Sequence, residues 1–229
     1  MWEDDAGWEP RIFEDRREAG RQLAARLMPY REQDPIVVAL PRGGVVIGFE
    51  IAQALRAPLD VLVARKLGAP GQPELGIGAI APGEVRVLDD FAVRYLGISQ
   101  RELARITAEE TQEMERRLQL YRDGRAALDI AHKTAILVDD GLATGVTARA
   151  AIRSLRRLQP RRIVLAVPVC APQTAEAIRP EVDDLVCLLQ PDPFRAVGLW
   201  YRDFEQVSDQ EVIALLQRAD RDVGIGVKG

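Results

Sequence analysis

Two adjacent carboxylates and a run of small residues form the part of the sequence that is best suited to chemistry. Asp139 and Asp140 follow the apolar segment 135–138, which has the length and composition of a buried parallel strand. The loop 141–147 then reads GLATGVT, and residues 149–158 show the apolar spacing of a helix. Strand, small-residue loop and helix start are the elements of a phosphate-binding turn.

The first turn of a helix leaves backbone N–H groups unpaired and carries partial positive charge, so this loop predicts an anion site. Val146 stands where a nucleoside triphosphate loop has a lysine, and the glycine spacing of dinucleotide folds is absent. The two carboxylates would repel a phosphate, but they can accept hydrogen bonds from sugar hydroxyls. A ribose phosphate therefore fits both halves of the motif.

Four apolar residues, two acidic residues and a T-G-x-T ending resemble the signature with which type I phosphoribosyltransferases bind phosphoribosyl pyrophosphate (PRPP). The resemblance implies that Asp139 and Asp140 hold the ribose hydroxyls and act in catalysis, while the loop wraps the 5′-phosphate. The residues expected to bind PRPP are Asp139, Asp140, Gly141, Leu142, Ala143, Thr144, Gly145, Val146 and Thr147. The alternative is an ordinary strand-to-helix turn that ends in two solvated aspartates.

A second glycine turn lies between the apolar run 36–40 and the helical pattern 45–56. Its arginine, Arg42, can make planar two-point contacts to phosphate oxygens. In the family that the chain resembles, a loop at this place binds pyrophosphate, which implies this role for Arg42, Gly43 and Gly44. The resemblance also implies a cis peptide bond, expected between Arg42 and Gly43. Taken alone, the turn favours the alternative of an exposed arginine without a ligand.

A third candidate segment begins where the strand predicted over 59–64 ends. Arg65 and Lys66 are followed by a stretch rich in glycine and proline, which predicts a flexible loop, and a hairpin turning at Pro82-Gly83 follows it. This order resembles the catalytic loop of the family, so Arg65 and Lys66 are expected to bind pyrophosphate and to act in catalysis when the loop closes. The alternative is a solvated strand end.

Aromatic residues gather in the segment 194–204 near the C-terminus. Their order resembles the hood of purine phosphoribosyltransferases, which implies that Phe194 and Trp200 bind the base; the alternative is that these rings belong to the core. The lysine with which 6-oxopurine enzymes read the base is missing upstream, and Ala143 stands where those enzymes have an aspartate. We therefore expect poor use of hypoxanthine and guanine.

Apolar runs of strand length alternate with helical patterns along the chain. This alternation predicts an α/β fold: a doubly wound parallel sheet of four to five strands flanked by helices. We expect a single domain over 1–229 with its core at about 35–205, and a small hood from about 1–30 and 190–221. The strands are predicted at 36–40, 59–64, 135–138, 162–169 and 184–189.

Composition narrows the classes of function. A net charge of −4 and a pI near 5.3 give no basic surface for nucleic acid. No run of about 18 apolar residues or leader-like segment occurs, and the two cysteines show no disulfide or zinc spacing, so we expect a cytoplasmic protein. His132 precedes the strand 135–138, away from the expected ligand end, so we expect it to be structural. No metal-ligating cluster is expected.

The blocks PRGGVVIG, ARKLGAPG, VDDGLATG and VGLWYRDF together resemble a bacterial group of phosphoribosyltransferases whose acceptor is unassigned. The resemblance implies transfer of 5-phosphoribosyl from PRPP to a nitrogen nucleophile, with release of pyrophosphate and with Mg²⁺ carried by the substrate. A PRPP-binding regulatory protein without transferase activity is the alternative. A hydrolase lacks a candidate nucleophile. The charged helix expected at 99–125 could form a homodimer contact.

Overall fold

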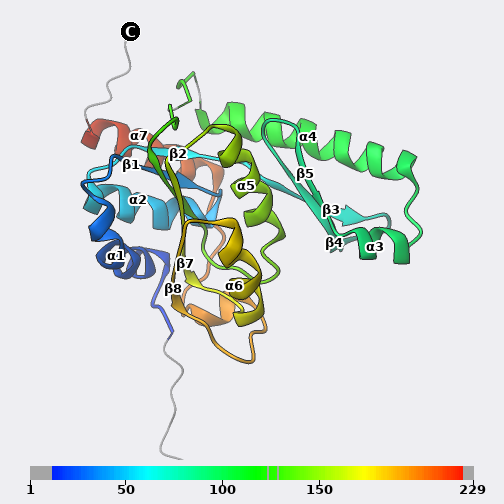
Figure 1. The fold of residues 1–229 in the computed structure, drawn as a ribbon. Helices are drawn as coiled ribbons and strands as arrows, with labels where there is room; N and C mark the ends of the chain where they lie inside the picture. The colour runs from blue at the N-terminus through cyan, green and yellow to red at the C-terminus, as the bar shows by residue number, and fades with distance from the viewer. Residues whose placement is uncertain (1–11, 123, 128, 224–229) are drawn as a thin grey trace, which may run out of the picture.

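The computed structural model describes residues 12–122, 124–127 and 129–223. Its centre is a five-stranded parallel sheet in the order β2-β1-β6-β7-β8 (Figure 1). The strands are β1 (Pro35–Ala39), β2 (Leu59–Val61), β6 (Thr134–Val138), β7 (Arg162–Val169) and β8 (Asp184–Leu189). This confirms the predicted α/β class, and the strands predicted at 162–169 and 184–189 match residue for residue.

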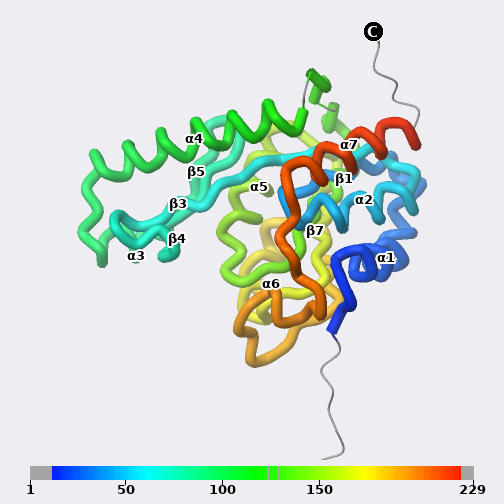
Figure 2. The backbone as a smooth tube through the Cα atoms, turned by 180° about the vertical axis from the view of Figure 1, so that it is seen from behind, coloured from blue at the N-terminus to red at the C-terminus, as the bar shows by residue number. Residues whose placement is uncertain are grey.

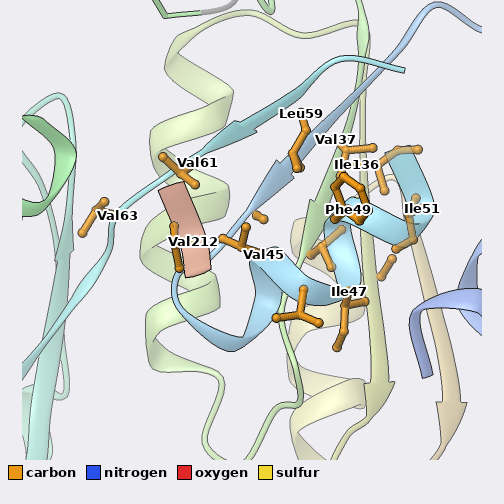
Figure 3. Close-up of a cluster of buried hydrophobic side chains, with 14 of the residues drawn as sticks. Val37, Val45, Ile47, Phe49, Ile51, Leu59, Val61, Val63, Ile136 and Val212 are labelled. Carbon is orange, nitrogen blue, oxygen red and sulfur yellow. The ribbon is translucent and has the colours of Figure 1, made fainter. Parts of the chain in front are cut away.

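Helices cover both faces of the sheet, which explains why its strands are continuous apolar runs. On one face lie α1 (Arg16–Leu27), α2 (Gly43–Leu55) and α7 (Asp209–Val223); on the other lie α5 (Val146–Arg157) and α6 (Pro172–Ile178). Successive side chains of each strand point to opposite faces of the sheet. Val37 and Ile136 pack with α2, as Figure 3 shows. Val38 and Leu137 point to the other face and pack with α5.

The register of the sheet brings two loops together. β1 and β6 are parallel neighbours, with Ala39 opposite Val138 at their carboxyl ends. The chain leaves β1 at residue 40 and β6 at residue 139, so the loops that follow both strands begin at the same edge of the sheet. In open α/β sheets ligands bind beyond this edge.

A second, antiparallel sheet extends to one side of the parallel one, and we call it with its helices the arm (Figures 1 and 2). The arm consists of β3 (Arg65–Ala69), β4 (Gln72–Ala81), β5 (Val85–Leu88), α3 (Asp90–Tyr95) and α4 (Gln100–Arg122). The turn at Pro82-Gly83 between β4 and β5 and the long helix after residue 99 are confirmed.

The flexible loop predicted after Lys66 is wrong as a description of this structure, because β3 and β4 form a hairpin there. Leu67 and Ile77 have no exposed surface and join the same core cluster as Leu103 and Ile106 of α4. Burial of these two side chains orders a segment whose glycine and proline content is typical of a loop. The strand predicted over 59–64 is also too long, since β2 ends at Val61.

The segments expected to form the hood meet through backbone hydrogen bonds. Phe13 pairs with Tyr201 in an isolated parallel bridge, and its N–H donates to the carbonyl of Trp200 at 2.8 Å. Residues 1–11 of the expected hood lie outside the described part.

Short 3₁₀ helices occur at Met28–Tyr30, Arg179–Glu181 and Val197–Trp200. Among the described residues, no helix has the length and apolar character that crossing a bilayer requires.

Candidate active site

The two carboxylates predicted from the sequence sit at the end of the central strand β6. β6 ends at Val138, and Asp139 is the next residue. The N–H of Leu40, just after β1, donates to the carbonyl oxygen of Val138 at 2.8 Å. Asp139 turns one carboxylate oxygen, Oδ1, back to accept the N–H of Asp140 at 2.8 Å. Asp139 and Asp140 therefore project from the edge where the loops after β1 and β6 meet.

The loop 141–147 leads from these carboxylates into α5. Gly145 is the residue before the helix and has a φ of +70°, a left-handed conformation that favours glycine. Neighbouring strands brace the loop: the N–H of Leu142 donates to Val169 and the N–H of Ala171 donates to Leu142, each at 2.9 Å. No side chain caps the start of α5 and its first turn carries no acidic residue, so these backbone N–H groups suit an anion.

The loop after β1 provides a second helix start beside the first. Gly43 and Gly44 open α2, again without a side-chain cap. A Cβ on Gly44 would lie 2.8 Å from the carbonyl oxygen of Val138, so glycine lets this helix start approach the end of β6. The cis peptide bond expected between Arg42 and Gly43 lies instead between Pro41 and Arg42. That prediction was wrong by one residue: the bond between Arg42 and Gly43 leads directly into α2, which begins at Gly43.

Of the three predicted cationic side chains, each is engaged within the protein. The guanidinium of Arg42 lies 3.7 Å from Asp209 of α7. Arg65 forms an ion pair with Glu110 of α4 at 2.7 Å, and the ammonium of Lys66 donates to the backbone oxygen of Glu74 in the hairpin. The structure thus brings Arg42 to the edge of the sheet, while Arg65 and Lys66 make their contacts inside the arm.

The predicted base-binding rings, Phe194 and Trp200, are half-buried. Both pack against a small hydrophobic cluster formed by Phe13, Ala19, Val169 and Tyr201. The indole N–H of Trp200 is buried, and among the described residues it has no hydrogen-bond partner. The rings therefore contribute to the core, and their role toward a ligand stays a prediction.

Three residues that we did not assign to the site lie at its carboxylates. Arg16 donates to Asp140 at 2.9 Å, and the hydroxyl of Tyr201 donates to the backbone oxygen of Asp140 at 2.6 Å. The ring of Phe204 lies under the guanidinium of Arg16, with 3.8 Å between its centroid and Cζ. The aromatic content of 194–204 pointed to the two rings, but Arg16 is 124 positions from Asp140 and has no local signal.

The electrostatics of the carboxylate pair are unusual for aspartates. Burial, followed by the neighbouring charge of Asp140, raises the pKa of Asp139 well above its ordinary value. Burial also raises the pKa of Asp140, although Arg16 opposes this shift. Burial together with the charge of Asp140 raises the pKa of the Tyr201 hydroxyl, which therefore stays protonated as a donor. Perturbed carboxylates at the ligand edge of a sheet are typical of functional sites.

Comparison with known proteins places the chain in a family. The family model described as phosphoribosyl transferase domain matches residues 12–200. A Mycobacterium tuberculosis (strain H37Rv) protein, Rv0571c, whose name assigns it provisionally to the phosphoribosyl transferases, is 45% identical over 212 residues. That alignment covers 93% of this chain and 48% of the relative, so the chain spans about half the length of the curated relatives it matches.

Solved structures show the same fold. The crystal structure of TT1426 from Thermus thermophilus is 40% identical, with a TM-score of 0.76 over 90% of this chain and 98% of that one. A hypothetical protein from Neisseria gonorrhoeae, solved with bound ppGpp, is 12% identical with a TM-score of 0.51, which is a likeness of fold alone. The family match covers most of the chain and includes both loops at the edge of the sheet. The chain therefore belongs to the phosphoribosyl transferase domain family.

Proposed function

We propose that the chain transfers the 5-phosphoribosyl group of PRPP to a nitrogen nucleophile and releases pyrophosphate. The observation that carries this proposal is the adjacency of β1 and β6, which sets two uncapped helix starts beside one carboxylate pair. PRPP has phosphate groups on either side of a ribose, so it matches two anion sites that flank hydrogen-bond acceptors. An isolated anion would match only one of them.

In this proposal, different residues bind different parts of PRPP. The loop 141–147 takes the 5′-phosphate, and Asp139 and Asp140 accept hydrogen bonds from the ribose hydroxyls. Arg42, Gly43 and Gly44 bind the pyrophosphate, and Arg65 and Lys66 reach it from the arm. Phe194 and Trp200 stand nearest the acceptor.

The reaction breaks the bond from C1 of the ribose to pyrophosphate, which leaves with the electron pair. A nitrogen lone pair then forms the new bond to C1, and the nitrogen loses its proton. The transition state resembles the oxocarbenium ion of glycoside cleavage. In this proposal the protein acts mainly by positioning the reactants and by stabilising charge: the two helix starts, together with Arg42 and Arg65, would stabilise the anion that departs.

Magnesium enters as part of the substrate. Among the described residues, no group of three or more histidine, cysteine or carboxylate side chains could hold a metal ion. Mg²⁺ commonly binds through phosphate oxygens and keeps several waters, which suits a Mg–PRPP complex. When bound, the ion would neutralise part of the charge that develops on pyrophosphate.

A PRPP-binding regulatory protein without transferase activity is the second candidate. The engagement of Arg65 with Glu110 and of Lys66 with Glu74 favours it, because these cations must leave their partners to reach pyrophosphate. The two candidates differ in turnover: both bind Mg–PRPP, but only the transferase releases pyrophosphate with an acceptor.

Calorimetry with Mg–PRPP, combined with a pyrophosphate-release assay over a panel of nitrogen bases and amines, tests the proposal. The double variant Asp139→Asn with Asp140→Asn should weaken PRPP binding about 100-fold or more, because two hydrogen bonds to charged acceptors become neutral. Asp34→Asn is the matched control, since this exposed aspartate lies before the opposite end of β6 and pairs only weakly, at 4.0 Å, with Lys133. Unchanged PRPP affinity in the folded double variant would overturn the assignment.

A further inference from the structure

Arg16 joins three parts of the molecule that are far apart in the sequence. It is the first residue of α1, and its Nε donates a 2.9 Å hydrogen bond to Oδ2 of Asp140. Its Nη1 donates a 2.8 Å hydrogen bond to the backbone oxygen of Glu205, and its guanidinium stacks over the ring of Phe204. One side chain therefore connects the N-terminal helix, the end of β6 and the segment before α7.

The ion pair is more shielded than an ordinary surface pair. The side chains of Arg16 and Asp140 are 11% and 20% exposed. The next residue, Arg17, is 41% exposed and approaches Glu50 and Glu211 only to 3.8 and 3.6 Å. Exposed pairs such as those of Arg17 contribute little, whereas loss of one partner from a shielded pair leaves an uncompensated charge. The two adjacent arginines thus provide a matched comparison.

The charges that face Asp140 are few. Asp139 precedes it, and the hydroxyl of Tyr201 donates to its backbone oxygen. Gly43, from the loop after β1, adds only backbone. Within the residues that the structure describes, Arg16 is the one cation in an ion pair with Asp140. Arg16 therefore offsets the repulsion between two neighbouring carboxylates at a site that must also receive an anionic ligand.

We propose that Arg16 is a positioning residue: it holds the Asp140 carboxylate in its present orientation and charged form, so that the remaining oxygen can accept a ribose hydroxyl. The inference rests on the proposed function, since it assigns Arg16 to the site at which PRPP would bind. Arg16 donates to Oδ2, and in this proposal the other oxygen, Oδ1, accepts the ribose hydroxyl. Without the guanidinium, Asp140 would be partly buried beside Asp139 with no cation facing it. It would then protonate at a higher pH, and its side chain would be free to turn away.

Three variants test this role: Arg16→Gln, Arg16→Lys and, as the matched control, Arg17→Gln. The first readout is the titration of the Asp140 carboxyl by carbon-13 NMR, which needs no ligand. Arg16→Gln should raise the Asp140 pKa by about one unit or more, because an opposite charge at hydrogen-bond distance typically lowers a carboxyl pKa by one to three units. Arg16→Lys keeps the charge and should restore most of the difference, while Arg17→Gln should titrate like the wild type.

The second readout is Mg–PRPP binding by calorimetry across the same pH range. Arg16→Gln should weaken binding about tenfold or more at the acidic end, and the pH at which affinity falls should rise together with the Asp140 pKa. Arg16→Lys should recover the pH profile. A role that is only structural would lower thermal stability without moving this profile.

The outcomes separate this inference from the proposed function. If the wild type binds no PRPP, the proposed function fails and the ligand part of the inference falls with it, while the NMR titration still decides whether Arg16 controls Asp140. If the wild type binds PRPP but Arg16→Gln shows an unchanged Asp140 titration or unchanged affinity, the positioning role is wrong. Should Arg16→Gln not fold, Arg16→Met takes its place, because this side chain has a similar length and can still contact Phe204 but carries no charge. A raised Asp140 pKa in Arg16→Met, restored in Arg16→Lys, supports the role, and an unchanged Asp140 titration contradicts it.

Discussion

Gly43 lies so close to Asp140 that no side chain fits between them. A Cβ built on Gly43 would lie 1.9 Å from Oδ2 of Asp140 and 2.7 Å from Nε of Arg16. Real Cβ atoms do not approach other atoms this closely, so the backbone of the loop after β1 packs directly on the carboxylate that follows β6. The two loops of the proposed PRPP site are therefore one structural unit.

We predict that Gly43→Ala displaces Asp140 and damages both loops. The extra methyl group should lower the free energy of unfolding by about 1–3 kcal/mol, as overpacking typically does, and should weaken Mg–PRPP binding. Gly76→Ala is the matched control for stability, because its Cβ would meet only the flexible end of Lys66, at 2.8 Å. Urea denaturation and calorimetry measure the two effects, and equal stability of the two variants would contradict the prediction.

Asp139 should lower the stability of the folded protein at neutral pH. Its pKa is raised in the folded state, so the stability linked to this group is complete below the unfolded pKa, near 3.9, and is lost as the pH rises through the folded value. A side-chain amide at this position would not ionise, and its oxygen could still accept the N–H of Asp140. We predict that Asp139→Asn increases the free energy of unfolding by about 0.5–2 kcal/mol at pH 7.

This gain should disappear at about pH 3 and below, where the wild-type carboxyl is protonated in both states because the pH lies below the unfolded pKa of about 3.9. Urea midpoints at the two pH values measure it, with Asp34→Asn as the control. A gain of equal size at both pH values would show that the effect comes from packing and not from ionisation.

The ion pair between Arg65 and Glu110 allows a structural role to be separated from a role in turnover. Arg65→Gln and Glu110→Gln both remove the pair, whose members are each 26% exposed, and each should cost at most about 1 kcal/mol of stability. If Arg65 acts on pyrophosphate, only Arg65→Gln should also lower the rate of pyrophosphate release. Parallel losses of turnover in both variants would indicate that the pair merely supports the arm.

Ala143 is expected to limit the choice of acceptor. Its side chain is exposed in the loop before α5, and a methyl group cannot take a proton from a purine ring. Help from a general acid or base is typically worth about 10² to 10⁴ in rate, so transfer to hypoxanthine or guanine should be slow. Steady-state assays should give a kcat/KM below about 10⁴ M⁻¹s⁻¹ for both bases, and a higher value would contradict the inference from Ala143.

The sequence by itself predicted those parts of the structure that depend on residues close together in the chain. The strands β7 and β8 could be predicted to the residue, because each is an apolar run of strand length; β7 is buried on both faces, and β8 is the partly buried edge strand beside it. The loop 141–147 was visible for a similar reason, since strand, glycine turn and helix start follow each other directly in the chain. The family, the α/β class and the carboxylate pair followed from these short-range features.

Contacts between distant segments were decided only by the tertiary structure. Leu67 and Ile77 turn a glycine-rich stretch into a hairpin because α4 buries them, and burial there outweighs the local preference for a loop. The pairing of β1 with β6 sets the two ligand loops side by side, although nearly a hundred residues separate them along the chain. Arg16 reaches Asp140 over 124 positions, since packing of α1 beside the sheet brings it there and no spacing in the sequence records such a contact.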